Sequence, residues 1–397
     1  MTTRAVVQEA EYTRRLEKVR ARMADRSFAA LVVTDPANIC YLTGYNAVSY
    51  YMPQCLVVPA EGDIVLFARA MDANGALRTA QALRADQVEG YSEELVHQPD
   101  RHPFDWISRR MLERELVPTE PRHLVGIESD SHYFSPRAYL ALRNGLPGLA
   151  LQDSRELVNW VRLVKSPAEV EHMRIAGTIA QRAMEVALDA VRPGRRQCDV
   201  VAEILAAQAC GTPEHGGDYP ALVPMLPTGE AAGTPHLTWT DDVFREGEAT
   251  AIELAGVYRR YHAPLARTIM LGEPPDRLID TAAAVTEGMG EVLHAAKPGR
   301  TVHELHALWD AVIRSYGLTK ESRIGYSIGL GYPPDWGEHT ISLRDGEHTE
   351  LQAGMCFHVI LGMWMDNWGY TLSEPIVVTE DGTERLTDLP QQLTIRK

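Results

Sequence analysis

The first part of the chain alternates short apolar runs with amphipathic stretches. An apolar run at 28–33 leads into a turn rich in Pro, Asn and Gly. Residues 54–69 contain two apolar runs around a Gly-Asp turn, a pattern typical of a β-hairpin. Residues 123–154 then give the order strand, loop, helix, strand. This alternation predicts an α/β domain over residues 1–158.

We place the second part of the chain at residues 159–397. A long helix is predicted near its start. Ser166 precedes Pro167, and Glu169 follows at the third helical position. This is a capping box, with a proline where the helix needs no backbone N–H. The apolar periodicity continues to the Arg-Pro-Gly sequence at 192–194, where the helix should end.

A faint internal repeat runs through the second part. Pro193-Gly194 and Pro298-Gly299 each separate two helical patterns, and strand-rich sequence follows each helix pair. Two helix pairs backing one antiparallel sheet would bury one face of the sheet and leave the other for a site. The fold class predicted is therefore α+β, and chance similarity of helix ends is the alternative explanation of the repeat.

Composition and charge narrow the class of protein. The chain has 39 Lys and Arg against 54 Asp and Glu, a formal net charge of −15, which argues against nucleic-acid and anionic-membrane partners. No apolar run approaches the roughly 20 residues of a membrane span, and the charged N-terminal sequence lacks the apolar core of a signal peptide. The 5 cysteines are scattered and indicate no disulfide framework. We expect a cytoplasmic enzyme.

Four segments of the second part set histidines and carboxylates among aromatics and glycines, as ligand pockets do. These segments are 214–239, 258–268, 322–344 and 356–378. Two carboxylates, Glu253 and Glu374, stand in apolar strands that should not bury an unpaired charge. Two buried carboxylates near a histidine are usual parts of acid–base or covalent carboxylate chemistry. His358, by contrast, we interpret as a structural histidine.

Other reaction classes lack their motifs. The chain contains no Gly-x-Ser-x-Gly sequence, no phosphate loop and no dinucleotide fingerprint. Two classes remain open on these residues: a metal hydrolase and a metal-free carboxylate hydrolase.

Over nearly its whole length, including Tyr-Leu-Thr-Gly-Tyr at 41–45, the chain resembles the creatinase / X-Pro aminopeptidase / methionine aminopeptidase family. The resemblance implies the pita-bread fold, with its pseudo-two-fold repeat, at 159–397. It also implies a creatinase-like α/β domain at 1–158. Family members usually form dimers, so we expect a homodimer.

The resemblance also bears on metal binding. Metal-dependent members carry two Asp, one His and two Glu as ligands. In this chain those positions fall on Glu253, Pro264, Tyr326, Ile360, and Ser373 or Glu374. Proline and isoleucine cannot bind a metal, and tyrosine is a poor exchange for histidine in such a site. We therefore expect no metal and no other cofactor.

Within the metal-free branch, the segments 215–230, 235–239, 258–268, 322–344 and 354–369 resemble ectoine hydrolases. The resemblance implies a metal-independent hydrolase that opens the cyclic amidine of ectoine to N-acetyl-L-2,4-diaminobutyrate. The substrate would be a small cationic or zwitterionic amidine. The alternatives are a creatinase-like enzyme for another amidine or guanidine, a metal-dependent X-Pro peptidase, and a non-catalytic binding protein.

Residue roles follow from this resemblance. Glu253 would be the nucleophile or base, His236 would move protons, and Glu374 would hold the amidinium nitrogens. Tyr326 would occupy the space that the metal fills in metal-dependent members. Arg323 or Arg260 would bind the substrate carboxylate. Trp336 and Trp368 would line the site and contact the amidinium through apolar and cation–π interactions. The predicted substrate-binding residues are Tyr326, Arg323, Arg260, His262, Trp336, Glu338, Trp368, Asp218 and Tyr219.

Overall fold

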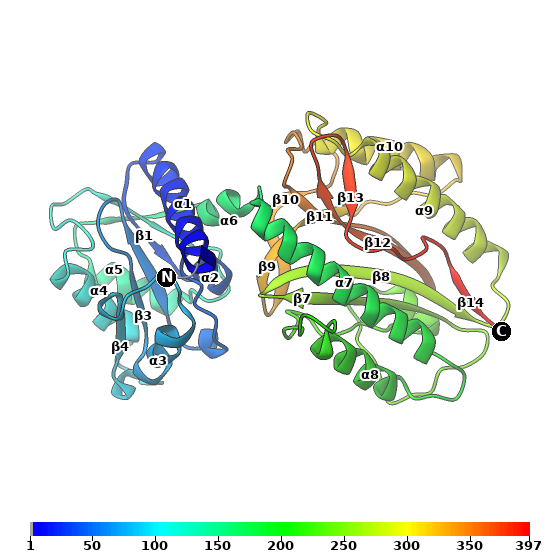
Figure 1. Ribbon diagram of the computed structural model, residues 1–397, viewed down its shortest axis with the longest axis horizontal. Helices are drawn as coiled ribbons and strands as arrows, with labels where there is room; N and C mark the ends of the chain where they lie inside the picture. The colour runs from blue at the N-terminus through cyan, green and yellow to red at the C-terminus, as the bar shows by residue number, and fades with distance from the viewer. Residues whose placement is uncertain (1–2) are drawn as a thin grey trace. The chain divides into compact units, whose positions relative to one another are not determined.

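The computed structural model describes residues 3–397 and divides into two compact units, Met1–Arg162 and Leu163–Lys397 (Figure 1). No helix among the described residues is long and apolar enough to cross a membrane.

The first unit is an α/β domain built on a six-stranded sheet of order β4-β3-β2-β1-β5-β6. The predicted hairpin is confirmed, because β2 and β3 pair antiparallel with Cys55 opposite Phe67. β1 pairs antiparallel with β2 and parallel with β5, so the sheet is mixed. The strands are β1 (Phe28–Val33), β2 (Cys55–Pro59), β3 (Val65–Arg69), β4 (Val88–Tyr91), β5 (Leu124–Ile127) and β6 (Ala150–Asp153). The helices are α1 (Thr3–Asp25), α2 (Pro36–Thr43), α3 (Ala70–Thr79), α4 (Pro103–Glu113), α5 (Pro136–Gly145) and α6 (Leu157–Arg162).

The second unit combines four long helices with a mainly antiparallel sheet, as an α+β fold requires. The sheet runs β13-β12-β11-β9-β8-β14, with β7 paired to β8 and β10 paired to β9. The helices are α7 (Pro167–Ala190), α8 (Gln197–Cys210), α9 (Asp276–Ala295) and α10 (Val302–Ser315). The strands are β7 (Ala249–Tyr258), β8 (Tyr261–Leu271), β9 (Gly325–Tyr332), β10 (Asp335–Ser342), β11 (Cys356–Met365), β12 (Trp368–Val378), β13 (Thr383–Arg385) and β14 (Thr394–Arg396).

Helix α7 begins and ends where the sequence predicts. The Ser166 hydroxyl accepts a hydrogen bond from the Glu169 backbone N–H, and the Glu169 carboxylate accepts one from the Ser166 backbone N–H at 3.0 Å. Pro167 occupies the first helical turn. The capping box therefore satisfies backbone donors that would otherwise lack partners at the helix start.

The internal repeat is confirmed. α7 and α8 are joined through Gly194, and α9 and α10 through Gly299, and both glycines have φ of 83°. A β-hairpin accompanies each helix pair, β7–β8 with the first and β11–β12 with the second (Figure 1). Each pair shares an apolar core with its own hairpin.

These cores define two faces of the sheet, because successive side chains of a strand point to opposite faces. Ile252 and Leu254 lie in the core of α7 and α8, and Leu372 and Ile376 lie in the core of α9 and α10. We call this the helix face and the opposite one the inner face. Glu253, between Ile252 and Leu254, is on the inner face.

Candidate active site

Glu253 lies in the middle of β7, where its backbone is held from both sides. β8 places Ala266 opposite it, and Met225 exchanges two backbone hydrogen bonds with it at 2.8 and 3.0 Å. The Glu253 residue is half-buried, and burial raises the pKa of its carboxyl to about 7. Both the carboxylate and the carboxylic acid are therefore populated near neutral pH, which suits a base or a nucleophile.

A two-residue turn sets the register of this strand. β7 and β8 are joined through Arg259 and Arg260, whose φ angles of 49° and 68° are the positive values that tight hairpin turns require. The Asp218 carboxylate accepts a hydrogen bond from the Arg260 backbone N–H at 2.9 Å. The turn fixes the pairing along the hairpin and so keeps Glu253 on the inner face.

A chain of hydrogen bonds joins five strands of the sheet. The Trp336 indole N–H donates to the Tyr326 hydroxyl at 2.8 Å, and that hydroxyl lies 3.0 Å from Nδ1 of His358. Nε2 of His358 lies 2.7 Å from the Ser373 hydroxyl, which accepts a hydrogen bond from the Ala266 backbone N–H at 2.6 Å. Ala266 is the residue opposite Glu253. This series of hydrogen bonds therefore ends on β8, the strand paired with β7, which carries the Glu253 carboxylate.

Burial determines the charge states of the two titratable groups in this series of hydrogen bonds, Tyr326 and His358. Burial, followed by the nearby Glu253 carboxylate, raises the pKa of Tyr326 well above its ordinary value. Burial, followed by the positive charge of Arg323, lowers the pKa of His358 to about 3. At neutral pH Tyr326 is therefore a phenol and His358 a neutral imidazole.

A small apolar cluster supports these groups. It contains Ala221, Met225, Ala255 and Trp336, with Tyr326 packed against it. Ala255 follows Glu253 by two positions on β7 and shares its face. The cluster therefore places apolar side chains on the same face of β7 as the Glu253 carboxyl.

Two cations lie on the segment that precedes β9. The Arg323 guanidinium is exposed, lies 4.4 Å from the centre of the Tyr326 ring and donates to the Ser342 hydroxyl at 3.0 Å. The Lys320 ammonium lies 4.2 Å from the centre of the Trp364 ring, and burial lowers its pKa to about 8. Of these two, Arg323 is the cation in contact with the hydrogen-bonded chain.

Glu374 belongs to a different environment from the one predicted. It is fully buried on the helix face, and its carboxylate accepts from Arg267 at 2.6 Å, from Thr387 at 2.8 Å and from Gln391 at 3.1 Å. Alternation along β12 places Glu374 with the apolar core and only Ser373 on the inner face. The expectation that Glu374 holds a substrate amidinium is therefore wrong, because an internal ion pair occupies it.

Arg260 is also engaged within the protein. Its guanidinium is buried, donates to the Gly331 and Tyr219 backbone carbonyls at 2.8 and 2.5 Å, and lies over the Tyr219 and Tyr332 rings at 4.0 and 4.6 Å. It therefore cannot anchor a substrate carboxylate as predicted. Asp218 and Tyr219 serve the same local structure, since they hold the turn and the arginine.

His262 likewise has a structural role. Its Nδ1 lies 2.8 Å from the Arg260 carbonyl, and its Nε2 accepts from the Ala221 backbone N–H at 2.9 Å. The ring is fully buried, and burial lowers its pKa well below the ordinary value. His262 therefore positions the segment that carries Met225 rather than facing a substrate.

Three further predicted residues have surroundings that do not include Glu253 among their contacts in the described residues. Glu338 forms a buried ion pair with Lys165, and Trp368 packs at the edge of the helix-face core under the guanidinium of Arg277 at 5.1 Å. His236 is exposed, on a loop closed by a hydrogen bond between residues 226 and 238. No interaction within the described residues links His236 to Glu253.

Of the predicted site residues, the structure thus joins Trp336 and Arg323 to Tyr326 by direct contacts, and the Glu253 carboxylate is near enough for its charge to raise the pKa of Tyr326. Sequence reasoning missed His358, which it assigned to structure alone, and Ser373, which it considered only as a metal position. A signal for Ser373 was present, because Leu372, Ile376 and Val378 share the parity of Glu374 and leave Ser373 on the other face.

The donor set does not suit a metal ion. Within the described residues no three His, Cys, Asp or Glu side chains are grouped so that they could hold one. The positions at which the resemblance predicts metal ligands carry Glu253, Pro264, Tyr326, Ile360, and Ser373 or Glu374. Tyr326 and Ser373 are both hydrogen-bonded to a neutral histidine. One carboxylate, with a histidine whose two nitrogens are both engaged in hydrogen bonds, is a poor divalent-metal site.

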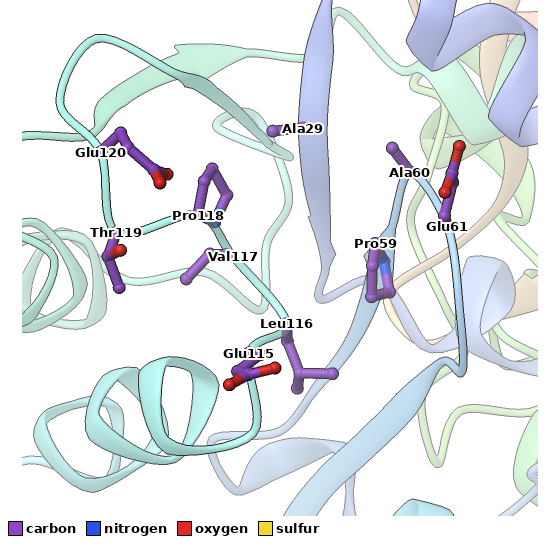
Figure 2. Close-up of a pocket in the computed structure, with 10 residues that line it drawn as sticks. All are labelled: Ala29, Pro59, Ala60, Glu61, Glu115, Leu116, Val117, Pro118, Thr119 and Glu120. Carbon is purple, nitrogen blue, oxygen red and sulfur yellow. The ribbon is translucent and has the colours of Figure 1, made fainter.

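The first unit has an open pocket with a volume of about 510 Å³. Its lining combines apolar side chains with three glutamates and contains none of the predicted site residues (Figure 2). The lining residues are Ala29, Pro59, Ala60, Glu61, Glu115, Leu116, Val117, Pro118, Thr119 and Glu120.

Comparison with known protein families finds two matches in this chain. Residues 15–164 match the Creatinase/Prolidase N-terminal domain, and residues 171–380 match Metallopeptidase family M24. The two matches fall on the two halves of the chain that the pattern of strands and helices separates.

Individual relatives agree with this match. The chain is 44% identical over 394 residues to the ectoine hydrolase of Halomonas elongata, covering 97% of each protein. It is 40% identical to an uncharacterized hydrolase/peptidase of Sinorhizobium fredii, covering 98% of each. The prolidase of Thermococcus sibiricus has the same fold, with a TM-score of 0.84 at 17% identity over 97% of this chain and 99% of that one. The expected pita-bread fold is confirmed.

Proposed function

The chain belongs to metallopeptidase family M24 and is a hydrolase acting on C–N bonds, and from this premise we propose that its substrate is ectoine. The reaction would add water across the cyclic amidine and yield N-acetyl-L-2,4-diaminobutyrate. The relative of 44% identity is an ectoine hydrolase, which supports the substrate. The observation that carries the proposal is the position of Glu253, half-buried on the inner face of the sheet and near enough to Tyr326 for its charge to raise the pKa of that phenol.

The proposed chemistry uses Glu253 at the amidine carbon. As a nucleophile, its carboxylate forms a C–O bond to that carbon while the amidinium π electrons move onto a ring nitrogen. That nitrogen then takes up a proton from solvent and leaves as an amine, while the lone pair of the other nitrogen forms a C=N bond to the same carbon. Water attacks the same carbon, releases Glu253 and leaves the acetyl group on the other nitrogen as an amide. As a base, Glu253 would instead take a proton from water as the water attacks directly.

We propose that this reaction proceeds without a metal ion. The proposal rests on the donor set, because proline and isoleucine stand at two ligand positions and a phenol and a serine hydroxyl at two others. An amidinium already carries the positive charge that a metal would otherwise induce on the carbon under attack. A carboxylate of raised pKa is therefore sufficient as the attacking or activating group.

Arg323 is proposed to bind the substrate carboxylate, because its guanidinium is exposed and lies against Tyr326. Replacing Arg323 with glutamine should raise KM for ectoine by roughly 10- to 100-fold, with a smaller change in kcat, since one charge-assisted hydrogen bond is lost. Steady-state kinetics measure both constants. Arg344→Gln, another exposed arginine of the same unit, should leave KM unchanged. An unchanged KM in Arg323→Gln would remove Arg323 from the binding site.

The function itself is tested with purified protein treated with a chelator and incubated with ectoine. Proton NMR should show disappearance of the ring signals and appearance of an acetyl methyl group. The same assay with creatine, other cyclic amidines and X-Pro dipeptides separates the alternatives. Turnover of a dipeptide alone, restored by added metal, would contradict both the substrate and the metal-free reaction.

A further inference from the structure

We infer that His358 and Ser373 are positioning residues that make the Tyr326 hydroxyl a hydrogen-bond donor toward the reacting group beside Glu253. The inference rests on the proposed function for the identity of the reacting group. The direction of the hydroxyl itself follows from the hydrogen bonds of the buried chain.

The first step concerns the protons of His358. The ring is fully buried and makes one hydrogen bond at each nitrogen, 3.0 Å to Tyr326 and 2.7 Å to Ser373. A neutral imidazole has one N–H donor and one acceptor nitrogen, so only two arrangements are available. Either Nδ1 donates to Tyr326 and Nε2 accepts from Ser373, or both directions are reversed.

Ser373 decides between the two arrangements. Its hydroxyl is fully buried and already accepts a hydrogen bond from the Ala266 backbone N–H at 2.6 Å. If Nε2 of His358 donated to it as well, the Ser373 proton would have no acceptor among the described residues. A buried hydroxyl proton without an acceptor loses its hydrogen bond to water and gains none in the protein. The Ser373 hydroxyl therefore donates to Nε2, and His358 carries its proton on Nδ1.

The proton position on His358 determines how the Tyr326 hydroxyl is hydrogen-bonded. Its oxygen accepts from Nδ1 of His358 and from the Trp336 indole at 2.8 Å, so both acceptor positions are filled. Its own proton must then point away from both donors. Tyr326 packs against the cluster that contains Ala255, the inner-face neighbour of Glu253 on β7, and the Glu253 carboxylate is near enough for its charge to raise the pKa of Tyr326. We place the Tyr326 proton on that side.

A donor in this place would serve the proposed reaction. When the amidine carbon is attacked, the π electrons move to a ring nitrogen, which becomes a strong hydrogen-bond acceptor. A fixed phenol donor can hydrogen-bond to that new lone pair without reorganising, as the donors of an oxyanion hole do for a developing oxyanion. The positioning chain keeps Tyr326 from turning its proton toward His358 in the absence of substrate.

Two substitutions at His358 separate this arrangement from a merely structural role. Asparagine places an amide near the former Nδ1 and can still donate to Tyr326. Glutamine places its amide near the former Nε2 and reaches Ser373 instead. We expect His358→Gln to lower kcat roughly 10- to 100-fold with little change in KM, and His358→Asn to retain activity within about fivefold. Equal losses in the two variants would overturn the inference.

A double-mutant cycle tests whether the effect passes through Tyr326. In a Tyr326→Phe background, His358→Gln should lower kcat no further, because the hydroxyl that it positions is absent. Fully additive losses would overturn the inference. Thermal unfolding of each variant verifies that the folded state is compared.

A measurement without substrate decides the arrangement even if ectoine proves to be the wrong substrate. Nitrogen-15 NMR of the labelled wild-type protein distinguishes the Nδ1–H from the Nε2–H form of a neutral histidine. The signal of His358 among the 14 histidines is identified by its loss in His358→Asn. We expect the Nδ1–H form at pH 7. The Nε2–H form would overturn the inference, whereas failure of turnover with an Nδ1–H signal would reject only the proposed substrate.

Discussion

Replacing Glu253 with glutamine should lower kcat for ectoine by about 10³- to 10⁴-fold while the protein stays folded. The amide has nearly the same shape as the carboxylate but is neither a nucleophile nor a base. Both routes proposed for the amidine carbon therefore fail in this variant. Steady-state kinetics at saturating ectoine measure the effect, and Glu291→Gln, an exposed carboxylate of α9, is the matched control. Near-normal turnover would exclude both roles of Glu253.

The pH dependence of the wild-type enzyme follows from the same residue. The attacking or activating form is the carboxylate, and burial raises the pKa of Glu253 to about 7. The constant kcat/KM should therefore rise with pH up to about 7 and level off above it. Below that value it should fall by about tenfold for each pH unit. A profile that is flat between pH 5 and 8 would contradict the assignment.

The stability of Glu253→Gln should change in the opposite sense to its activity. A carboxyl whose pKa rises from 4.5 in the ordinary state to about 7 in the folded protein destabilises the fold when it is ionised. The cost is absent below pH 4.5, grows up to about pH 7 and is constant above it. At pH 8 the variant should be more stable by about 1–3 kcal/mol, a range reduced for the partial exposure of the carboxylate. Urea unfolding at pH 8 and pH 4 should show this gap and its disappearance.

Replacing Glu374 with leucine should destabilise the fold by about 3–5 kcal/mol and leave the chemistry of the folded molecules unchanged. The substitution leaves Arg267 buried without its carboxylate, 2.6 Å away in the native protein, and burial already lowers the pKa of that arginine. Glu374 faces the helix-side core, so no reacting group should contact it.

Denaturant unfolding and kinetics at low temperature separate these two effects. Glu384→Leu is the matched control, because it breaks an exposed pair with Arg174 and should cost less than about 1 kcal/mol. If Glu374→Leu instead lost kcat at nearly unchanged stability, Glu374 would act in the reaction, as its sequence position suggested.

Much of the fold is readable in the chain because its signals are local. The capping box at Ser166 and the two Pro-Gly turns each lie within a few residues, and they predicted the start of α7 and the internal repeat. The presence of Pro264 and Ile360 at positions where the resemblance predicts metal ligands is likewise read from residue identity alone. Glu253 stood out because its apolar neighbours in β7 predict burial for any side chain at that position.

Whether another polar residue is available to bind a substrate depends on partners that lie far away in the sequence. Arg260 meets a backbone carbonyl 71 residues later, and Arg267 meets Glu374, 107 residues later. Each arginine in isolation is as suitable for a substrate carboxylate as Arg323 is. Strand pairing decided that Arg260 and Arg267 are held by partners within the protein and that Arg323 remains exposed.

The hydrogen-bonded chain through Tyr326, His358 and Ser373 shows the same limit. Its members come from separate strands, and only their register brings the hydroxyls within 3.0 Å of the imidazole nitrogens. Periodicity within a strand is a property of consecutive residues, so it can be seen in the sequence. The partner of a buried polar group is set by which strands lie side by side, and that arrangement exists only in the folded sheet.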